Sequence, residues 1–157
     1  MKTFALIMLA LVAFSFANAQ KSIDLSIKTS DGNLFKQDAD IYTMPTIKIL
    51  GLKTDAEFKT LEKSILADPY VAKFQYLDQA EADGARKALL SFKGNDEKTI
   101  VNFFKSINVN NIIINDKTFT VNQIEEIKTY VHELKAKKKA ERDANTASKK
   151  RVSDPNE

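Results

Sequence analysis

Few side chains in this sequence have the types and spacing that enzyme chemistry requires. The chain contains no cysteine, which excludes thiol nucleophiles, disulfides and zinc–thiolate sites. Its single histidine, His132, lies at helical spacing beside apolar residues and near Lys128 and Lys135. We therefore expect a solvated helix residue at this position, which is far more common than a catalytic base or a metal ligand in such surroundings.

Carboxylates gather in two short stretches, Asp38 with Asp40 and Asp78 with Glu81 and Asp83. Both stretches resemble turns, where acidic residues serve solubility and turn formation. Paired carboxylates can hydrolyse glycosides, but a small α+β domain offers little cleft for a sugar chain. No Gly-x-Ser-x-Gly elbow is present, and the glycines are too scattered for a phosphate loop. We expect no enzymatic activity and no bound cofactor, with an unrecognised hydrolase as an alternative.

The most specific local pattern is Thr54-Asp55-Ala56-Glu57. This is a capping box, in which the threonine hydroxyl accepts a hydrogen bond from the Glu57 amide while the glutamate carboxylate reaches back to the amide at the cap. Apolar residues follow at helical spacing until Asp68-Pro69. The pattern predicts a helix between these two points.

Alternating apolar residues and turn signals predict one α+β domain over residues 46–134. The expected strands are 46–50, 71–77, 86–93 and 112–114, and the expected helices begin at Thr54, Asn95 and Asn122. Strand, helix, strand, strand, helix, strand is the order of a ferredoxin-like βαββαβ sandwich, and the last helix is an addition that covers the open sheet face or an edge. Residues 20–45 are expected to form an extended N-terminal arm or hairpin.

The segment from Ile47 to Glu57, Ile-Lys-Ile-Leu-Gly-Leu-Lys-Thr-Asp-Ala-Glu, resembles the opening of a heavy-metal-associated domain, the copper-chaperone fold. In that family a strand leads into Gly-Met-Thr-Cys-x-x-Cys. Leu61-Glu62-Lys63 and Asp68-Pro69-Tyr70-Val71 are similar to the family's Val-Glu-Lys and Leu-Pro-Gly-Val. The resemblance covers roughly residues 46–114 and implies a metal-handling ancestry.

The metal ligands of that family are missing. The positions of its two thiolates fall at Thr54 and Glu57, whose hard oxygens do not replace sulfur for a soft ion such as Cu(I). The resemblance therefore implies a degenerate domain with no metal site. Because copper chaperones of this fold meet their partners around the metal loop, Leu52, Lys53, Thr54 and Glu57 become a candidate contact patch for a protein partner. We therefore expect an exported, non-catalytic protein-interaction or structural module on this scaffold, with a residual role in metal-ion binding or transport as the alternative.

The N-terminus has the three zones of an export signal. Met1-Lys2 is positive, Phe4 to Phe16 is almost wholly apolar, and Ala17-Asn18-Ala19 is a small-x-small cleavage pattern. The apolar run is shorter than the roughly 20 residues that a spanning helix needs. We expect residues 1–19 to be a signal peptide and the mature protein to be periplasmic or secreted, with no membrane-spanning segment.

The basic excess of the chain belongs to its C-terminal tail. Residues 135–157 hold eight basic and four acidic side chains, whereas residues 21–134 hold fifteen and seventeen. So polar a tail cannot bury enough apolar surface to order itself, and we expect it to be disordered. Its segment from Lys137 to Arg151 is a candidate for weak contact with an anionic surface. Nucleic acid is not expected, because no aromatic residues are interleaved with the charges.

Overall fold

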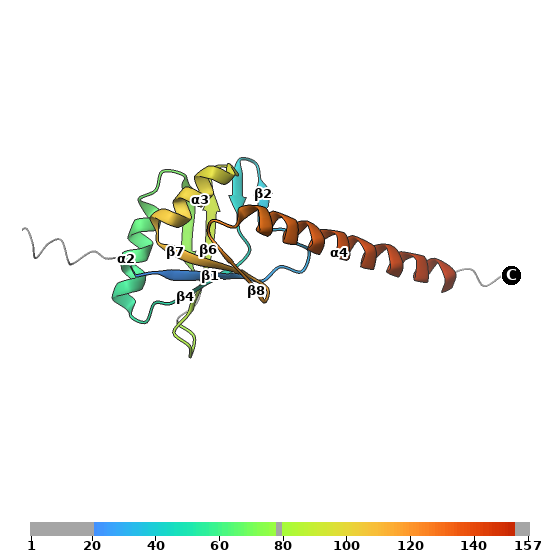
Figure 1. Ribbon diagram of the computed structural model, residues 1–157, viewed down its shortest axis with the longest axis horizontal. Helices are drawn as coiled ribbons and strands as arrows, with labels where there is room; N and C mark the ends of the chain where they lie inside the picture. Colours follow the sequence, from blue (N-terminus) through green and yellow to red (C-terminus); the bar gives the residue numbers. More distant parts are fainter. Residues whose placement is uncertain (1–20, 78–79, 153–157) are drawn as a thin grey trace, which may run out of the picture.

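The computed structural model describes residues 21–77 and 80–152, with side chains described as far as residue 146. The expected signal peptide, residues 1–19, lies outside these ranges. Within them the chain is α+β, with an eight-stranded sheet and three helices (Figure 1). The elements are β1 (Ile23–Ile27), β2 (Lys36–Asp38), β3 (Ile41–Thr43), β4 (Ile47–Leu50), α2 (Asp55–Leu66), β5 (Val71–Tyr76), β6 (Arg86–Phe92), α3 (Glu97–Ser106), β7 (Val109–Ile114), β8 (Lys117–Thr120) and α4 (Ile124–Val152).

The strands follow the order β2-β3-β6-β4-β1-β7-β8, and β5 pairs with β6 as well. All neighbours are antiparallel except β1 and β7, which are parallel. β3 and β4 both pair with β6, with Thr43 opposite Ser91 and Ile47 opposite Ala88. Pro45 lies between them and has no N–H to donate, which explains why the ladder is interrupted there.

β1 belongs to the sheet of the domain. Residues 20–45 were expected to form an arm or hairpin outside a domain at residues 46–134, and for β1 this expectation was wrong. This strand lies between β4 and β7, so the sheet does not have the plain four-strand order that was expected. Ile23, Leu25 and Ile27 are each 1 % exposed, while Asp24 and Ser26 point to the other face. Alternation of this kind marks a strand with one buried face, but it does not distinguish a central strand from an edge. β2 and β3 do form a hairpin.

The core lies between one face of the sheet and the helices. Phe58, Leu61 and Ile65 of α2 are buried, and so are the α3 residues Ile100, Phe103 and Phe104. Together with the inward-facing residues of the strands, they form one apolar cluster. Within it the rings of Phe92 and Phe103 meet edge to face, with centroids 5.2 Å apart. α4 joins this cluster through its first turns, where Tyr130 packs on Phe119 of β8.

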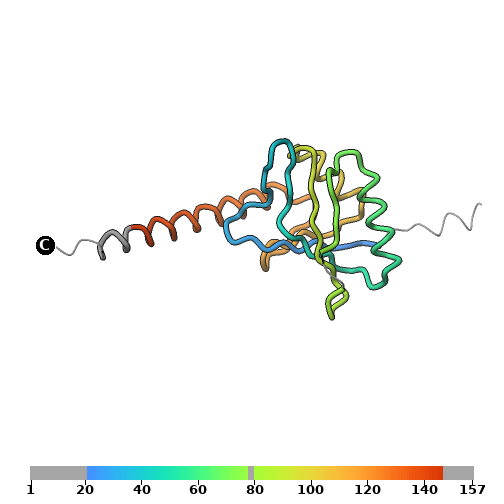
Figure 2. Tube along the Cα trace, turned by 180° about the vertical axis from the view of Figure 1, so that it is seen from behind, coloured from blue at the N-terminus to red at the C-terminus, as the bar shows by residue number. Residues whose placement is uncertain are grey.

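α4 continues far beyond the domain (Figures 1 and 2). It was expected to end near Leu134, with disorder over residues 135–157, but the helix runs to Val152. The expectation of disorder was wrong because it rested only on the lack of apolar residues in this segment. Alanine, lysine, arginine and glutamate are strong helix formers whether or not they are buried, and Lys138 and Glu141 form an ion pair along the helix at 3.6 Å.

Candidate functional site

The turn between β4 and α2 is closed by the side chains that the sequence indicated. Thr54 Oγ1 accepts a hydrogen bond from the Glu57 amide at 3.3 Å. In return, Glu57 Oε2 accepts from the amides of Lys53 at 2.7 Å and Thr54 at 3.0 Å. The predicted capping box is therefore confirmed. It satisfies backbone donors that a helix start would otherwise leave without partners.

The electrostatics of this turn hold Glu57 as a carboxylate. The backbone amides of Lys53 and Thr54 lower its pKa to about 2, with a smaller contribution from Lys21, whose Nζ lies 3.4 Å away. The oxygens of the turn are thus engaged with the protein itself. Among the side chains of residues 21–77 and 80–146, no three His, Cys, Asp or Glu residues are grouped as a metal ion would require.

Three residues of the candidate contact patch reach the surface: Lys53 and Thr54 are exposed and Glu57 is partly exposed. The fourth, Leu52, is only 5 % exposed and belongs to the core. Asp55, the residue next to the cap, is paired with Arg86. The Arg86 guanidinium also lies over the ring of Phe58, 4.4 Å from its centroid. Arg86 therefore fastens the start of α2 to the domain through both contacts.

Among the residues that the structure describes, the other candidate side chains from the sequence are not brought together in one group. His132 is exposed on α4, and Asp38 and Asp40 are exposed near the β2–β3 turn. Glu81 and Asp83 both pair with Lys48, at 2.6 and 2.8 Å. These contacts lower the pKa of each carboxyl group. The two carboxylates fasten the β5–β6 connection to the sheet, which is a structural use; Asp78 lies outside the described residues.

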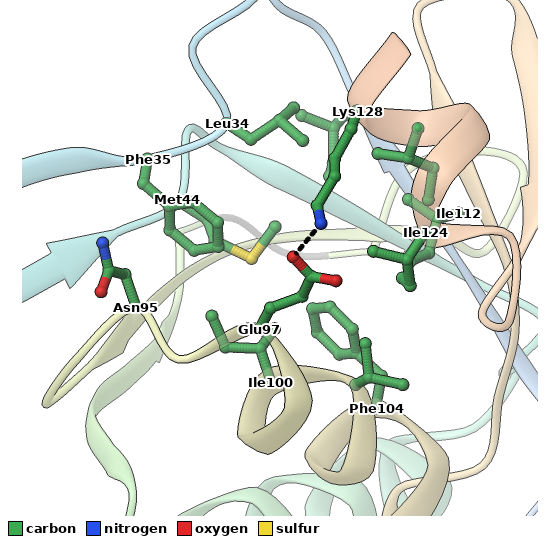
Figure 3. A pocket seen from close by; sticks show the side chains of 13 residues that line it. Leu34, Phe35, Met44, Asn95, Glu97, Ile100, Phe104, Ile112, Ile124 and Lys128 are labelled. Carbon is green, nitrogen blue, oxygen red and sulfur yellow. Dashed lines mark ion pairs between the residues drawn. The ribbon is translucent and has the colours of Figure 1, made fainter. Parts of the chain in front are cut away.

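A pocket of about 190 Å³ lies between the sheet, α3 and α4 (Figure 3). The sheet contributes Ile27 and Ile112, and α3 contributes Ile100, Val101 and Phe104. The remaining apolar wall comes from α4 and from the segment before β4, through Ile124, Ile127, Leu34, Phe35 and Met44. The lining is therefore almost entirely aliphatic, aromatic or thioether.

Three polar side chains line the same pocket: Asn95, Glu97 and Lys128. Lys128 Nζ lies 2.6 Å from Glu97 Oε2, and 3.0 Å from an oxygen of Glu125 in its own helix. Both carboxylates raise the pKa of Lys128, with Glu97 contributing more. The Lys128 and Glu97 side chains are about half exposed, 50 % and 47 %. Exposed pairs of this kind contribute about 1 kcal/mol or less, so opening this one costs little.

The sequence did not indicate this pocket. Its apolar residues occur at helix and strand spacing and were expected to fill the core. Phe103 and Phe104 of α3 are both buried, at 2 % and 4 % exposure, and only Phe104 lines the pocket. The hollow arises where the Leu34-Phe35 segment, α3 and α4 meet without closing, and residue spacing carries no signal for such a gap.

Comparison with known proteins adds no relative: the sequence matches no protein-family model, no curated protein and no solved structure. Among the described helices, none combines the length and the apolar character that crossing a bilayer requires.

Proposed function

We propose that this protein is an exported, non-catalytic binding module that receives a small apolar ligand in the pocket between α3 and α4. The observation that carries the proposal is the pocket itself, a largely apolar hollow of about 190 Å³ at whose rim Glu97 and Lys128 form a weak ion pair. Pockets of this type, apolar with a few polar groups at one side, are the usual form of small-molecule sites.

The size and the lining of the pocket suit a small apolar ligand. A cavity of about 150 Å³ already accepts benzene or xenon. A ligand of that size or slightly larger regains contacts that the lining side chains lack.

The scaffold proposal combines the sheet order with the resemblance to heavy-metal-associated domains. β4, α2 and β5 form a split βαβ unit with β6 between the two strands, which supports a ferredoxin-like arrangement. In the second βαβ unit, β6–α3–β7, the strands β4 and β1 both lie between β6 and β7, because β1 has been added to the sheet. We infer a degenerate member of that fold, in which the capping box of Thr54 and Glu57 occupies the place of the metal loop.

The test of ligand binding is a methyl NMR titration of the full mature chain with toluene. We expect saturable shifts at the methyl groups of Met44, Ile100 and Ile112, which line the pocket, and none at Ile65 of α2. The variant Val101→Phe places a ring in the pocket and should abolish these shifts. Val131→Phe is the matched control, because Val131 is partly buried on α4 but does not line the pocket.

Two results would contradict the proposal. One is a wild-type spectrum that does not change at saturating toluene. The other is a folded Val101→Phe variant that responds as strongly as the wild type, because the ligand would then be bound elsewhere.

A second candidate function is contact with an anionic surface through α4. Within residues 135–146 the helix carries five basic and two acidic side chains, and nearly all of them are exposed. Cosedimentation with vesicles containing anionic lipid, but not with zwitterionic vesicles, would support this function if a chain ending at residue 134 lost the effect. Equal binding of the shortened chain would exclude the helix as the contact.

A further inference from the structure

We propose that the ligand of this pocket is a free α-amino acid with a large apolar side chain, its ammonium group on Glu97 and its carboxylate on Lys128. This inference rests on the proposed function and adds the chemical class of the ligand. It is carried by the placement of one negative and one positive side chain together on the rim of an apolar hollow (Figure 3).

The charges at the pocket suit a head group that carries both signs. Glu97 and Lys128 have each other as partners at 2.6 Å. A ligand with only a carboxylate would take Lys128 and leave Glu97 beside a second negative charge. A ligand with only an ammonium group would take Glu97 and leave Lys128 with Glu125 alone, whose side chain is 81 % exposed. A zwitterion entering between the two replaces one ion pair by two.

The remaining polar groups agree with this head group. Asn95 also lines the pocket and offers both an amide donor and an acceptor, so it can serve a carboxylate or an ammonium group. Glu125 faces Lys128 from the side of its own helix at 3.0 Å, which keeps Lys128 charged. No group on this rim therefore requires an uncharged ligand.

The volume of the pocket limits the side chain. About 190 Å³ exceeds the roughly 150 Å³ that holds benzene, which leaves room for a benzyl or a branched butyl group. The aliphatic and aromatic lining provides no buried partner for a hydroxyl or amide at the far end of such a side chain, and burying a polar group without a partner is costly. The pocket therefore selects apolar side chains such as those of phenylalanine and leucine.

Four probes that share a phenyl ring separate the contributions of the carboxylate and the ammonium group to binding affinity. L-Phenylalanine carries both charges, 3-phenylpropanoate only the carboxylate, 2-phenylethylamine only the ammonium group, and ethylbenzene neither. We expect L-phenylalanine to bind most tightly in methyl NMR titrations, with a Kd about twofold to fivefold lower than that of each singly charged probe, as one additional exposed ion pair of up to about 1 kcal/mol implies. Ethylbenzene leaves the Glu97–Lys128 pair intact and should bind about as tightly as the singly charged probes.

Two variants then assign each charge to its partner. Lys128→Gln should remove the advantage of L-phenylalanine over 2-phenylethylamine, and Glu97→Gln its advantage over 3-phenylpropanoate. Glu81→Gln removes a carboxylate that pairs with Lys48 and Lys87 and does not line the pocket, so it should leave all four affinities unchanged.

The outcomes distinguish this inference from the proposed function. If all four probes bind equally, or ethylbenzene binds best, the pocket is an apolar site and the amino-acid assignment is wrong. If none binds, both proposals fail. Retention of the full preference for L-phenylalanine in the folded Lys128→Gln variant would also overturn the assignment, because its carboxylate would then have another partner.

Discussion

Lys128 of α4 and Glu97 of α3 are joined by an ion pair of 2.6 Å at the rim of the apolar pocket. Glu97 is the first residue of its helix, and Lys128 lies one turn into its own. The pair links the starts of two elements that are separated by the β7–β8 hairpin. Because both side chains are about half exposed, the link is weak enough to open for a ligand.

The carboxylate that closes the β4–α2 turn should make the stability of the protein depend on pH. The pKa of Glu57 is about 2 in the folded protein and 4.5 without its contacts. A lowered folded-state pKa means that the stabilisation is complete above pH 4.5 and is lost as the pH falls toward 2. The free-energy difference between wild type and Glu57→Gln, measured by urea unfolding, should therefore narrow across this window.

Thr54→Ala is the control for that experiment. It removes the hydroxyl that accepts from the Glu57 amide while leaving the carboxylate and its two amide donors in place. We expect a loss of about 1 kcal/mol with little dependence on pH. The assigned pKa of Glu57 would be contradicted if the difference in free energy of unfolding between wild type and Glu57→Gln stayed constant from pH 6 to pH 2.

The central position of β1 predicts a large effect for Leu25→Ala. The Leu25 side chain is 1 % exposed and lies opposite Ile49 on one side and Ile112 on the other. Its truncation should lower the free energy of unfolding by about 3 kcal/mol, whereas Ser26→Ala on the other face should change it by less than about 0.5 kcal/mol. If both variants were equally well tolerated, the segment would be an arm as the sequence suggested.

The fold was predictable where local pattern and global arrangement agree. The expected β4, α2, β5, β6, α3 and β7 were all found, because caps, turn residues and periodicity are local signals. The sequence did not predict β8. The tight turn that leads from β7 into β8 contains Asn115, whose backbone φ is +56°. Strand order and the hollow between α3 and α4 depend on which elements meet in space, and no spacing along the chain encodes that.

The outer part of α4 should contribute little to the stability of the domain. Its side chains from Lys135 to Thr146 are almost all exposed. A chain ending at residue 137 should keep its free energy of unfolding within about 0.5 kcal/mol and lose only helical circular dichroism. Tyr130→Ala, which removes the ring packed on Phe119, should instead cost about 2 kcal/mol or more. A large loss from the truncation alone would mean that the outer helix packs on the domain.

The resemblance to heavy-metal-associated domains can be tested by restoring sulfur. Thr54 is the N-cap of α2 and residues 55–57 form the first turn of that helix, shortly after β4; the resemblance places the thiolates of the family at Thr54 and Glu57. Thr54→Cys with Glu57→Cys should therefore create Cu(I) binding at one ion per chain under reducing conditions, because soft thiolates suit this ion. The single variant Glu57→Cys is the control and should bind far more weakly. A folded double variant without affinity would mean that the turn is not equivalent to the metal loop.

The most direct measurement on the pocket is a crystal structure, under xenon pressure, of the chain from residue 20 to residue 157. Xenon enters apolar cavities without any polar recognition, so it tests the hollow apart from the chemistry of its rim. We expect a xenon peak among Met44, Phe104 and Ile112, below the Glu97–Lys128 pair. Side chains that fill this space, with no xenon bound there, would contradict it.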